Sequence, residues 1–161
     1  MRHILFLAQR LPYPPNKGDK IRSWHILEHL ARNYAVHLAC FIDDEADWAH
    51  AEKVRSVCAS THFVALKPWP ARLRCAAALM AGAPLTFAYF HDRGLGRWVE
   101  ALHARESISA QFVFCSSMAP YAQRVENYAG TRVIDFVDVD SQKWDDYAAR
   151  SSLPKKLIYA R

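Results

Sequence analysis

Short apolar runs recur along the chain, and segments with helical spacing separate them. Each run is bounded by polar residues, glycines or prolines, a pattern typical of strands buried in a parallel sheet. The sequence therefore predicts five strands, at Ile4–Ala8, Ala35–Ile42, Thr61–Leu66, Gln111–Cys115 and Thr131–Val137.

Between these runs the apolar residues recur at the spacing of one helix face. Trp24, Leu27 and Leu30 mark that face in the first helix, and Gly82 ends the third. Strand and helix alternate, which predicts an α/β fold with a Rossmann-like parallel sheet and helices on both faces. The expected helices are Asp19–Asn33, Asp47–Ala59, Pro68–Ala81, Arg97–Arg105, Met118–Tyr128 and Ser141–Ala149.

The loop after the first strand is the first candidate binding site. Right-handed crossovers bring all such loops to the carboxyl edge of the sheet, where ligands bind in these folds. A helix beginning near Gly18 would present free N–H groups to a phosphate, and Lys17, Lys20 and Arg22 would add positive charge. A single glycine is a weak motif. The alternative is a tight turn with solvated lysines, in which Asp19 caps the helix.

The loop after the fourth predicted strand carries two hydroxyl groups. Ser116 and Ser117 would either donate hydrogen bonds to a sugar or phosphate, or cap the following helix. No Gly-x-Ser-x-Gly motif is present, so the pattern does not favour a hydrolase nucleophile.

Two short motifs could suggest a metal. His25-Ile-Leu-Glu28-His29 has the letters of an inverted zinc-protease signature, but it lies on the outer face of its helix and has no third ligand. Asp138 and Asp140 form an Asp-x-Asp pair, which could hold a divalent cation or simply cap the next helix. For both motifs we favour a solvated or capping role, and we expect no metal.

Composition and charge narrow the class of protein. The 161 residues, 52% of them hydrophobic, suffice for one ordinary domain. The net charge of +5 favours anionic partners, and a helix over Pro70–Ala81 with Arg72 and Arg74 near its start could lie on an anionic membrane or be a buried crossover helix. No nucleic-acid-binding signature is present. The cysteines form no Cys-x-x-Cys pair, which indicates reduced thiols.

Three segments resemble a known family. The opening MRHILFLAQRLPYPPNKGDKIRSWHILEHLA is similar to the start of family 4 glycosyltransferases, and FCSSMAPYA and RVIDFVDVDSQKWDDYA are similar to the same group. The resemblance is strongest to the subgroup associated with PEP-CTERM exopolysaccharide systems. It implies a GT-B architecture, in which two Rossmann-like domains face each other across a cleft.

The resemblance also implies an activity, the retaining transfer of a sugar from a nucleotide-diphosphate sugar to a glycan or lipid-linked acceptor. Lys17, Gly18 and Asp19 would lie beneath the donor diphosphate. The acceptor would contact the side chains of four further residues, which are Arg22, Ser116, Ser117 and Asp138. Such enzymes need no Asp-x-Asp metal, so no cofactor is expected.

The same resemblance suggests a division of the chain. Residues 1–150 would form the N-terminal, acceptor-side domain, and residues 151–161 would begin a helix leading to a second domain. We therefore expect a cytoplasmic enzyme, peripheral at the inner face of the plasma membrane, of which these residues alone are inactive. The alternative is a stand-alone Rossmann-like module that binds a nucleotide or a protein. A nucleotide-cofactor oxidoreductase is a weaker idea, because Gly-x-Gly-x-x-Gly is missing.

Overall fold

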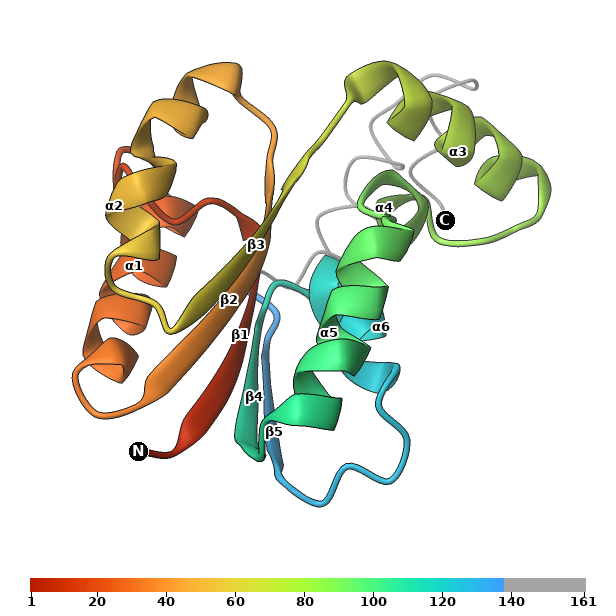
Figure 1. Ribbon diagram of the computed structural model, residues 1–161. Coiled ribbons are helices and arrows are strands. Elements are labelled where there is room, and N and C mark those ends of the chain that lie inside the picture. Colours follow the sequence, from red (N-terminus) through yellow and green to blue (C-terminus); the bar gives the residue numbers. More distant parts are fainter. Residues whose placement is uncertain (138–161) are drawn as a thin grey trace.

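The computed structural model describes residues 1–137, which fold around one parallel sheet (Figure 1). Its strands lie in the order β3-β2-β1-β4-β5, and every neighbouring pair is parallel. This confirms the α/β, Rossmann-like prediction. The strands are β1 His3–Arg10, β2 Ala35–Ile42, β3 Ser60–Ala65, β4 Ile108–Phe114 and β5 Thr131–Asp135.

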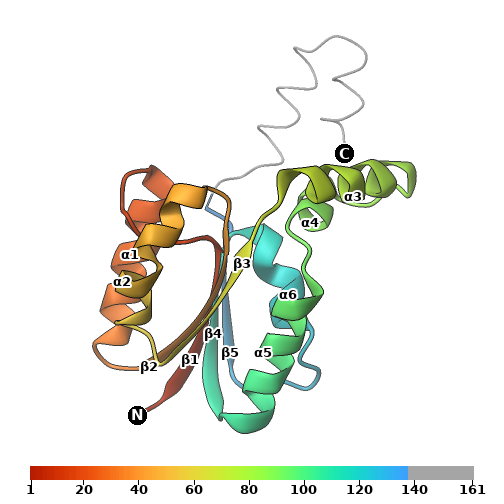
Figure 2. The ribbon, with the colours of Figure 1, turned by 45° about the horizontal axis from the view of Figure 1, so that its top comes forward.

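Helices cover both faces of the sheet (Figure 1). One face carries α1 (Gly18–Ala31), the short 3-10 helix η1 (Glu45–His50) and α2 (Ala51–Arg55). The other carries α5 (Arg93–Arg105), the 3-10 turn η2 (Ser116–Met118) and α6 (Ala119–Gln123). Two further helices, α3 (Pro68–Met80) and α4 (Leu85–Tyr89), pack on each other beyond the carboxyl edge of the sheet (Figure 2).

The core has two halves, and β1 contributes to both. Leu5 and Leu7 belong to the half that contains Leu95 of α5, whereas Phe6 belongs to the half that contains Trp24 of α1. Alternate residues of a strand point to opposite faces, so a strand without polar residues is buried on both faces of the sheet. Each such large side chain contributes about 1.5–3 kcal/mol through its burial. The continuous apolar run of β1 thus explains its central place.

The start of α5 differs from the prediction. The sequence predicts a helix that starts at Arg97, but α5 begins at Arg93 and includes Gly94 and Gly96. Asp92 explains the earlier start, because its Oδ1 accepts the N–H of Leu95 at 2.8 Å and so satisfies one free donor of the first turn.

Three other helices also differ. The helix expected over Asp47–Ala59 is divided into η1 and α2, and the one expected over Met118–Tyr128 is α-helical only to Gln123. The sequence did not predict α4, which is five residues long and begins directly after Pro84. The expected helix Ser141–Ala149 and the boundary between 1–150 and 151–161 lie outside the described residues. No helix within residues 1–137 is long and apolar enough to cross a membrane.

Candidate functional site

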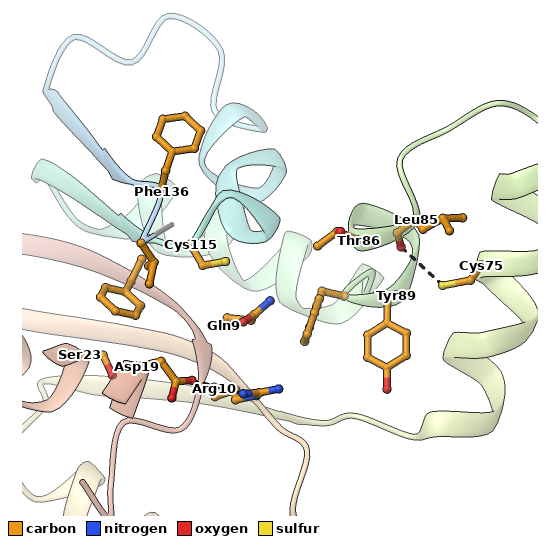
Figure 3. Close-up of a pocket in the computed structure, with 13 residues that line it drawn as sticks. Gln9, Arg10, Asp19, Ser23, Cys75, Leu85, Thr86, Tyr89, Cys115 and Phe136 are labelled. Carbon is orange, nitrogen blue, oxygen red and sulfur yellow. Dashed lines mark hydrogen bonds and ion pairs between the residues drawn. The ribbon is translucent and has the colours of Figure 1, made fainter. Parts of the chain in front are cut away.

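A cavity of about 580 Å³ opens at the carboxyl edge of the sheet. It lies between the ends of β1 and β4, which are neighbours in the sheet although five α-helices, one 3-10 helix and two strands separate them in the chain. This is the point where the strand order reverses, and open α/β sheets bind their ligands there. Figure 3 shows residues of β1 and α1 facing those of α4. The lining residues are Gln9, Arg10, Asp19, Ser23, Cys75, Leu85, Thr86, Tyr89, Phe90, Phe114, Cys115, Phe136 and Val137.

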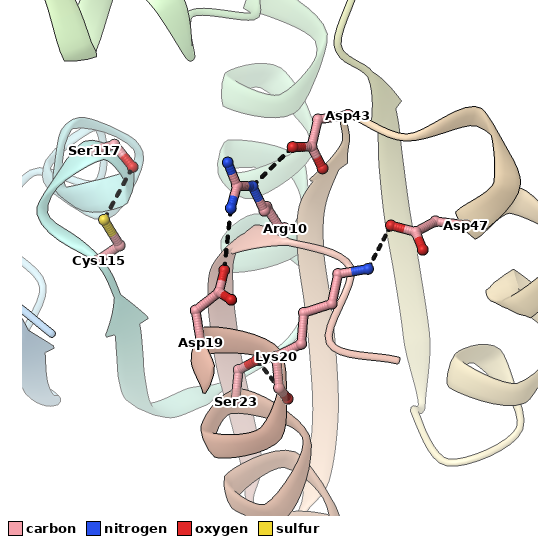
Figure 4. A network of polar contacts seen from close by, with 8 residues as sticks. All are labelled: Arg10, Asp19, Lys20, Ser23, Asp43, Asp47, Cys115 and Ser117. Carbon is pink, nitrogen blue, oxygen red and sulfur yellow. Dashed lines mark hydrogen bonds and ion pairs between the residues drawn. The ribbon is translucent and has the colours of Figure 1, made fainter. Parts of the chain in front are cut away.

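Among the described residues, Arg10, the last residue of β1, provides the positive charge of this lining. Its Nη1 lies 3.3 Å from Asp19 Oδ2, and its Nε lies 2.8 Å from Asp43 Oδ2 (Figure 4). The second contact is an ion pair without the geometry of a hydrogen bond. Two carboxylates therefore flank one guanidinium. The local charge is not positive, so this side of the cavity is better suited to a neutral polar molecule than to a diphosphate.

A second part of the lining is largely apolar. Leu85, Tyr89 and Phe90 come from α4 and its end, and Phe114 and Phe136 come from the ends of β4 and β5. Apolar walls with a few polar groups are the usual composition of small-molecule sites. The polar groups here include the amide of Gln9 and the hydroxyls of Ser23 and Thr86. This composition fits a ligand with both an apolar face and hydroxyl groups.

Two lining residues have backbone angles that L-amino acids rarely adopt. Cys115 has a φ of 84° and Val137 a φ of 66°. Such residues cost about 1–3 kcal/mol each and persist only where their surroundings hold them. Asp135 stabilises both conformations through hydrogen bonds. Its carbonyl oxygen accepts the N–H of Cys115 at 2.9 Å, and its Oδ1 accepts the N–H of Val137 at 2.9 Å.

Arg22 acts on this arrangement from α1. Its Nη2 lies 2.6 Å from the other oxygen of Asp135, and its guanidinium lies 5.9 Å from the ring centre of Phe114. The side chain is about half exposed and does not line the cavity itself. Its observed contacts therefore fix the strand ends β4 and β5, while a contact with the acceptor stays a prediction.

The predicted diphosphate residues divide into two groups. Lys17 is the N-cap of α1 and Gly18 its first residue; both are exposed and outside the cavity lining. A Cβ on Gly18 would meet no atom within 4 Å, so the packing of the protein does not require a glycine there. Asp19 lines the cavity, where it pairs with Arg10. The expectation that its side chain caps α1 is wrong, because the N-cap residue is Lys17 and makes no side-chain cap bond.

Lys20 does not face a ligand, contrary to the expectation. Its side chain is only 3% exposed, and its Nζ lies 2.5 Å from Asp47 Oδ2 in η1 (Figure 4). The spacing Lys20, Ser23, Trp24, Leu27 places it on the inward face of α1. A buried cation needs a partner, and Asp47 supplies it from 27 residues away.

The predicted serines lie near the cavity without lining it. Ser117 is buried and donates a hydrogen bond to Cys115 Sγ at 3.5 Å, and Ser116 begins η2. Neither belongs to the cavity lining. Asp138 and Asp140 lie outside the described residues.

The structure provides no cluster for a metal in the part that it describes. Within residues 1–137, no three His, Cys, Asp or Glu side chains come close enough to hold an ion. His25 and Glu28 form an exposed ion pair, with 3.6 Å between Nδ1 and Oε2. The thiol of Cys75 donates to Leu85 O at 3.5 Å, and burial raises its pKa, so at neutral pH it is protonated and a poor nucleophile.

Sequence reasoning missed most of the cavity wall. The residues of α4 gave no signal because the helix is too short for a periodic pattern. The sequence places Asp135 within a predicted strand, although an Asp at the end of a strand is a signal for the carboxyl edge.

Comparisons of the chain with models of protein families, with curated proteins and with solved structures found no match.

Proposed function

We propose that this domain is the acceptor-binding half of a retaining sugar transferase that resembles family 4. The observation that carries the proposal is the cavity at the switch point, with its apolar wall and its amide, hydroxyl and paired charged groups. An acceptor with hydroxyl groups and an apolar portion matches this lining. Its substrates would be a nucleotide-diphosphate sugar and a glycan or lipid-linked acceptor, with no metal and no resident cofactor.

The two substrates would take different parts of the sheet edge. The exposed start of α1, at Lys17 and Gly18, leaves room for the diphosphate of the donor, and its free N–H groups favour negative charge. The cavity, whose cation is already paired, would hold the acceptor. This domain would work together with a second, donor-binding domain, and residues 1–161 alone would have no appreciable turnover.

The main contribution of this domain to the reaction would be to position the acceptor hydroxyl. The bond between the sugar C1 and the diphosphate oxygen breaks, a bond from C1 to the acceptor oxygen forms, and the acceptor proton passes to the departing diphosphate. Holding the acceptor hydroxyl close to C1 lowers the entropic part of the barrier. The amide of Gln9 can donate or accept hydrogen bonds there and the Asp19 carboxylate can accept them, while Arg10 keeps that carboxylate in place.

The test uses the whole chain and two probes. We expect p-nitrophenyl glycosides to shift the NMR signals of Gln9 and Tyr89, and uridine or guanosine diphosphate to shift the amide signals of Gly18 and Asp19. Thr86→Trp, in the lining, should abolish only the response to the glycosides. Thr131→Trp, an exposed threonine at the opposite edge, is the matched control and should change neither.

Other results would count against the proposal. A response to the nucleotides without any response to a glycoside would favour the stand-alone nucleotide-binding module. Sugar transfer by residues 1–161 alone would overturn the statement that this half needs a partner domain.

A further inference from the structure

The segment 67–89, which comprises α3 and α4 and is called the arm below, has an unusual surface. Its exposed residues on α3 recur at one helix face, but they are mostly apolar. Trp69 is 69% exposed, Leu73 58% and Met80 87%, while Ala71 is the buried residue of the helix. The stripe, in full, is Trp69, Arg72, Leu73, Ala76, Ala77 and Met80.

The inner side of α3 is already used. Arg74 donates to the carbonyl oxygens of Ala88 and Tyr89 at 3.0 and 3.1 Å, and the thiol of Cys75 donates to Leu85. These contacts fix α3 against α4 and determine which face is left outward. The orientation of α3 is therefore set by its contacts with α4, and these contacts leave its apolar face exposed. On α4, Phe87 adds a further exposed aromatic ring.

The charged side chains of the arm have a single sign. The chain contains no Asp or Glu between Glu52 and Asp92, whereas Lys67, Arg72 and Arg74 lie within the arm. Arg74 is turned to α4, which leaves Lys67 and Arg72 exposed beside Trp69. Among residues 1–137 no ion pair involves either of these two cations.

We propose that the arm docks on the surface of an anionic lipid bilayer. An interfacial helix combines apolar side chains, which enter the boundary of headgroups and acyl chains, with Lys or Arg that attract anionic headgroups. Trp69 at the start of α3, between two cations, is the residue type preferred at such interfaces. A neutral protein surface would gain nothing from the acid-free stretch. Docking of the arm on a bilayer does not require that the protein transfers a sugar.

Cosedimentation of the whole chain with vesicles tests this. We expect binding to vesicles of phosphatidylglycerol mixed with phosphatidylcholine, weaker binding as salt rises, and little binding to phosphatidylcholine alone. Lys67→Gln and Arg72→Gln should each weaken binding about fivefold, as expected for one cation near an anionic surface. Trp69→Ser combined with Leu73→Ser should weaken it by more than tenfold.

A matched control distinguishes vesicle binding through the arm from nonspecific binding through any exposed tryptophan. Trp48 lies in η1 on the other side of the sheet and is 39% exposed. Trp48→Ser should leave vesicle binding unchanged. An equal loss with Trp48→Ser, or equal binding to both vesicle types, would overturn the proposal.

Two other occupants would give distinct results. With fluorine-labelled tryptophan, the resonance that disappears in Trp69→Phe reports on that side chain. If it is shielded from solvent in lipid-free protein at every concentration, another part of the chain covers the face, and the bilayer proposal fails. If it becomes shielded only as protein concentration rises, together with dimers in sedimentation, a second copy is the occupant and the proposal fails as well.

Discussion

Helices α1 and α3 have similar lengths and each follows a strand of the sheet, but they expose opposite kinds of side chain. α1 buries Trp24 and Leu27 and turns polar residues such as His25 outward. α3 buries little more than Ala71 and turns Trp69 and Leu73 outward. The hydrophobic effect within the domain explains the sequence of α1. It does not explain that of α3, whose apolar residues must be accounted for by something outside the domain's core.

The largest expected effect comes from the polar anchor of α1. Asp47→Ala would leave Lys20 as a buried charge without a partner, and we expect a loss of about 3–5 kcal/mol in the free energy of unfolding. Urea unfolding measures this. The double variant Lys20→Met, Asp47→Leu should recover most of the loss, because it removes both charges. If Asp47→Ala unfolds like the unchanged chain, Lys20 is not held as described.

A matched pair of leucines compares the two helices directly. Leu27→Ala removes a fully buried side chain and should cost about 2–5 kcal/mol. Leu73→Ala removes one that is 58% exposed and should change the free energy of unfolding by less than about 0.5 kcal/mol. Both are read from urea midpoints at constant slope. Similar losses in the two variants would mean that the arm is part of the core after all.

The smallest expected effect is a dependence on pH that belongs to the sheet region and not to the arm. Burial lowers the pKa of His37 on β2, of His62 on β3 and of His103 on α5. The nearby charges of His3 and Arg132 lower the pKa of His37 and His103 further. The fold thus favours the neutral form of all three.

The sign follows from proton uptake. The histidines of the unfolded chain have a pKa of about 6.5, and below this pH the unfolded chain binds more protons than the folded one. The free energy of unfolding therefore falls as the pH falls, and the contribution of the three histidines is fully present only above the unfolded pKa. Urea midpoints between pH 7.5 and 5 should decrease steadily. Replacing His37 by Gln should reduce the slope, and a slope that is unchanged in this variant would contradict the assignment.

The sequence predicts well those features that neighbouring residues determine, and poorly those that depend on residues distant in the chain. β2 is predicted to the residue, and α3 almost so, since Pro68 and Gly82 mark its ends by local rules. The start of α5 was wrong because Asp92 as a cap outweighs two glycines. Lys20 was placed outside by its residue type, although its partner Asp47 lies in another element and cannot be found from local spacing.

The candidate site follows the same division. The carboxyl edge and the position of Asp19 at it could be predicted, since alternation of strand and helix fixes the edge and the first loop must end there, whereas the diphosphate role of Asp19 stays a prediction. The walls could not, because Tyr89 of α4 and Phe136 after β5 are far apart in the chain and come to one cavity only through the tertiary fold. The roles proposed for Lys17, Gly18, Ser116 and Ser117 stay predictions, and the structure adds the geometry against which each can be tested.

One wall of the cavity belongs to the arm, through Leu85, Thr86 and Tyr89, whereas the opposite side belongs to the sheet and α1. Substitutions in the exposed part of the arm change few interior contacts, so their cost to folding is small. Ligand choice can then diverge through the arm while the sheet keeps its sequence. A library of variants restricted to residues 84–89 would be a natural starting point for redirecting this domain toward other ligands.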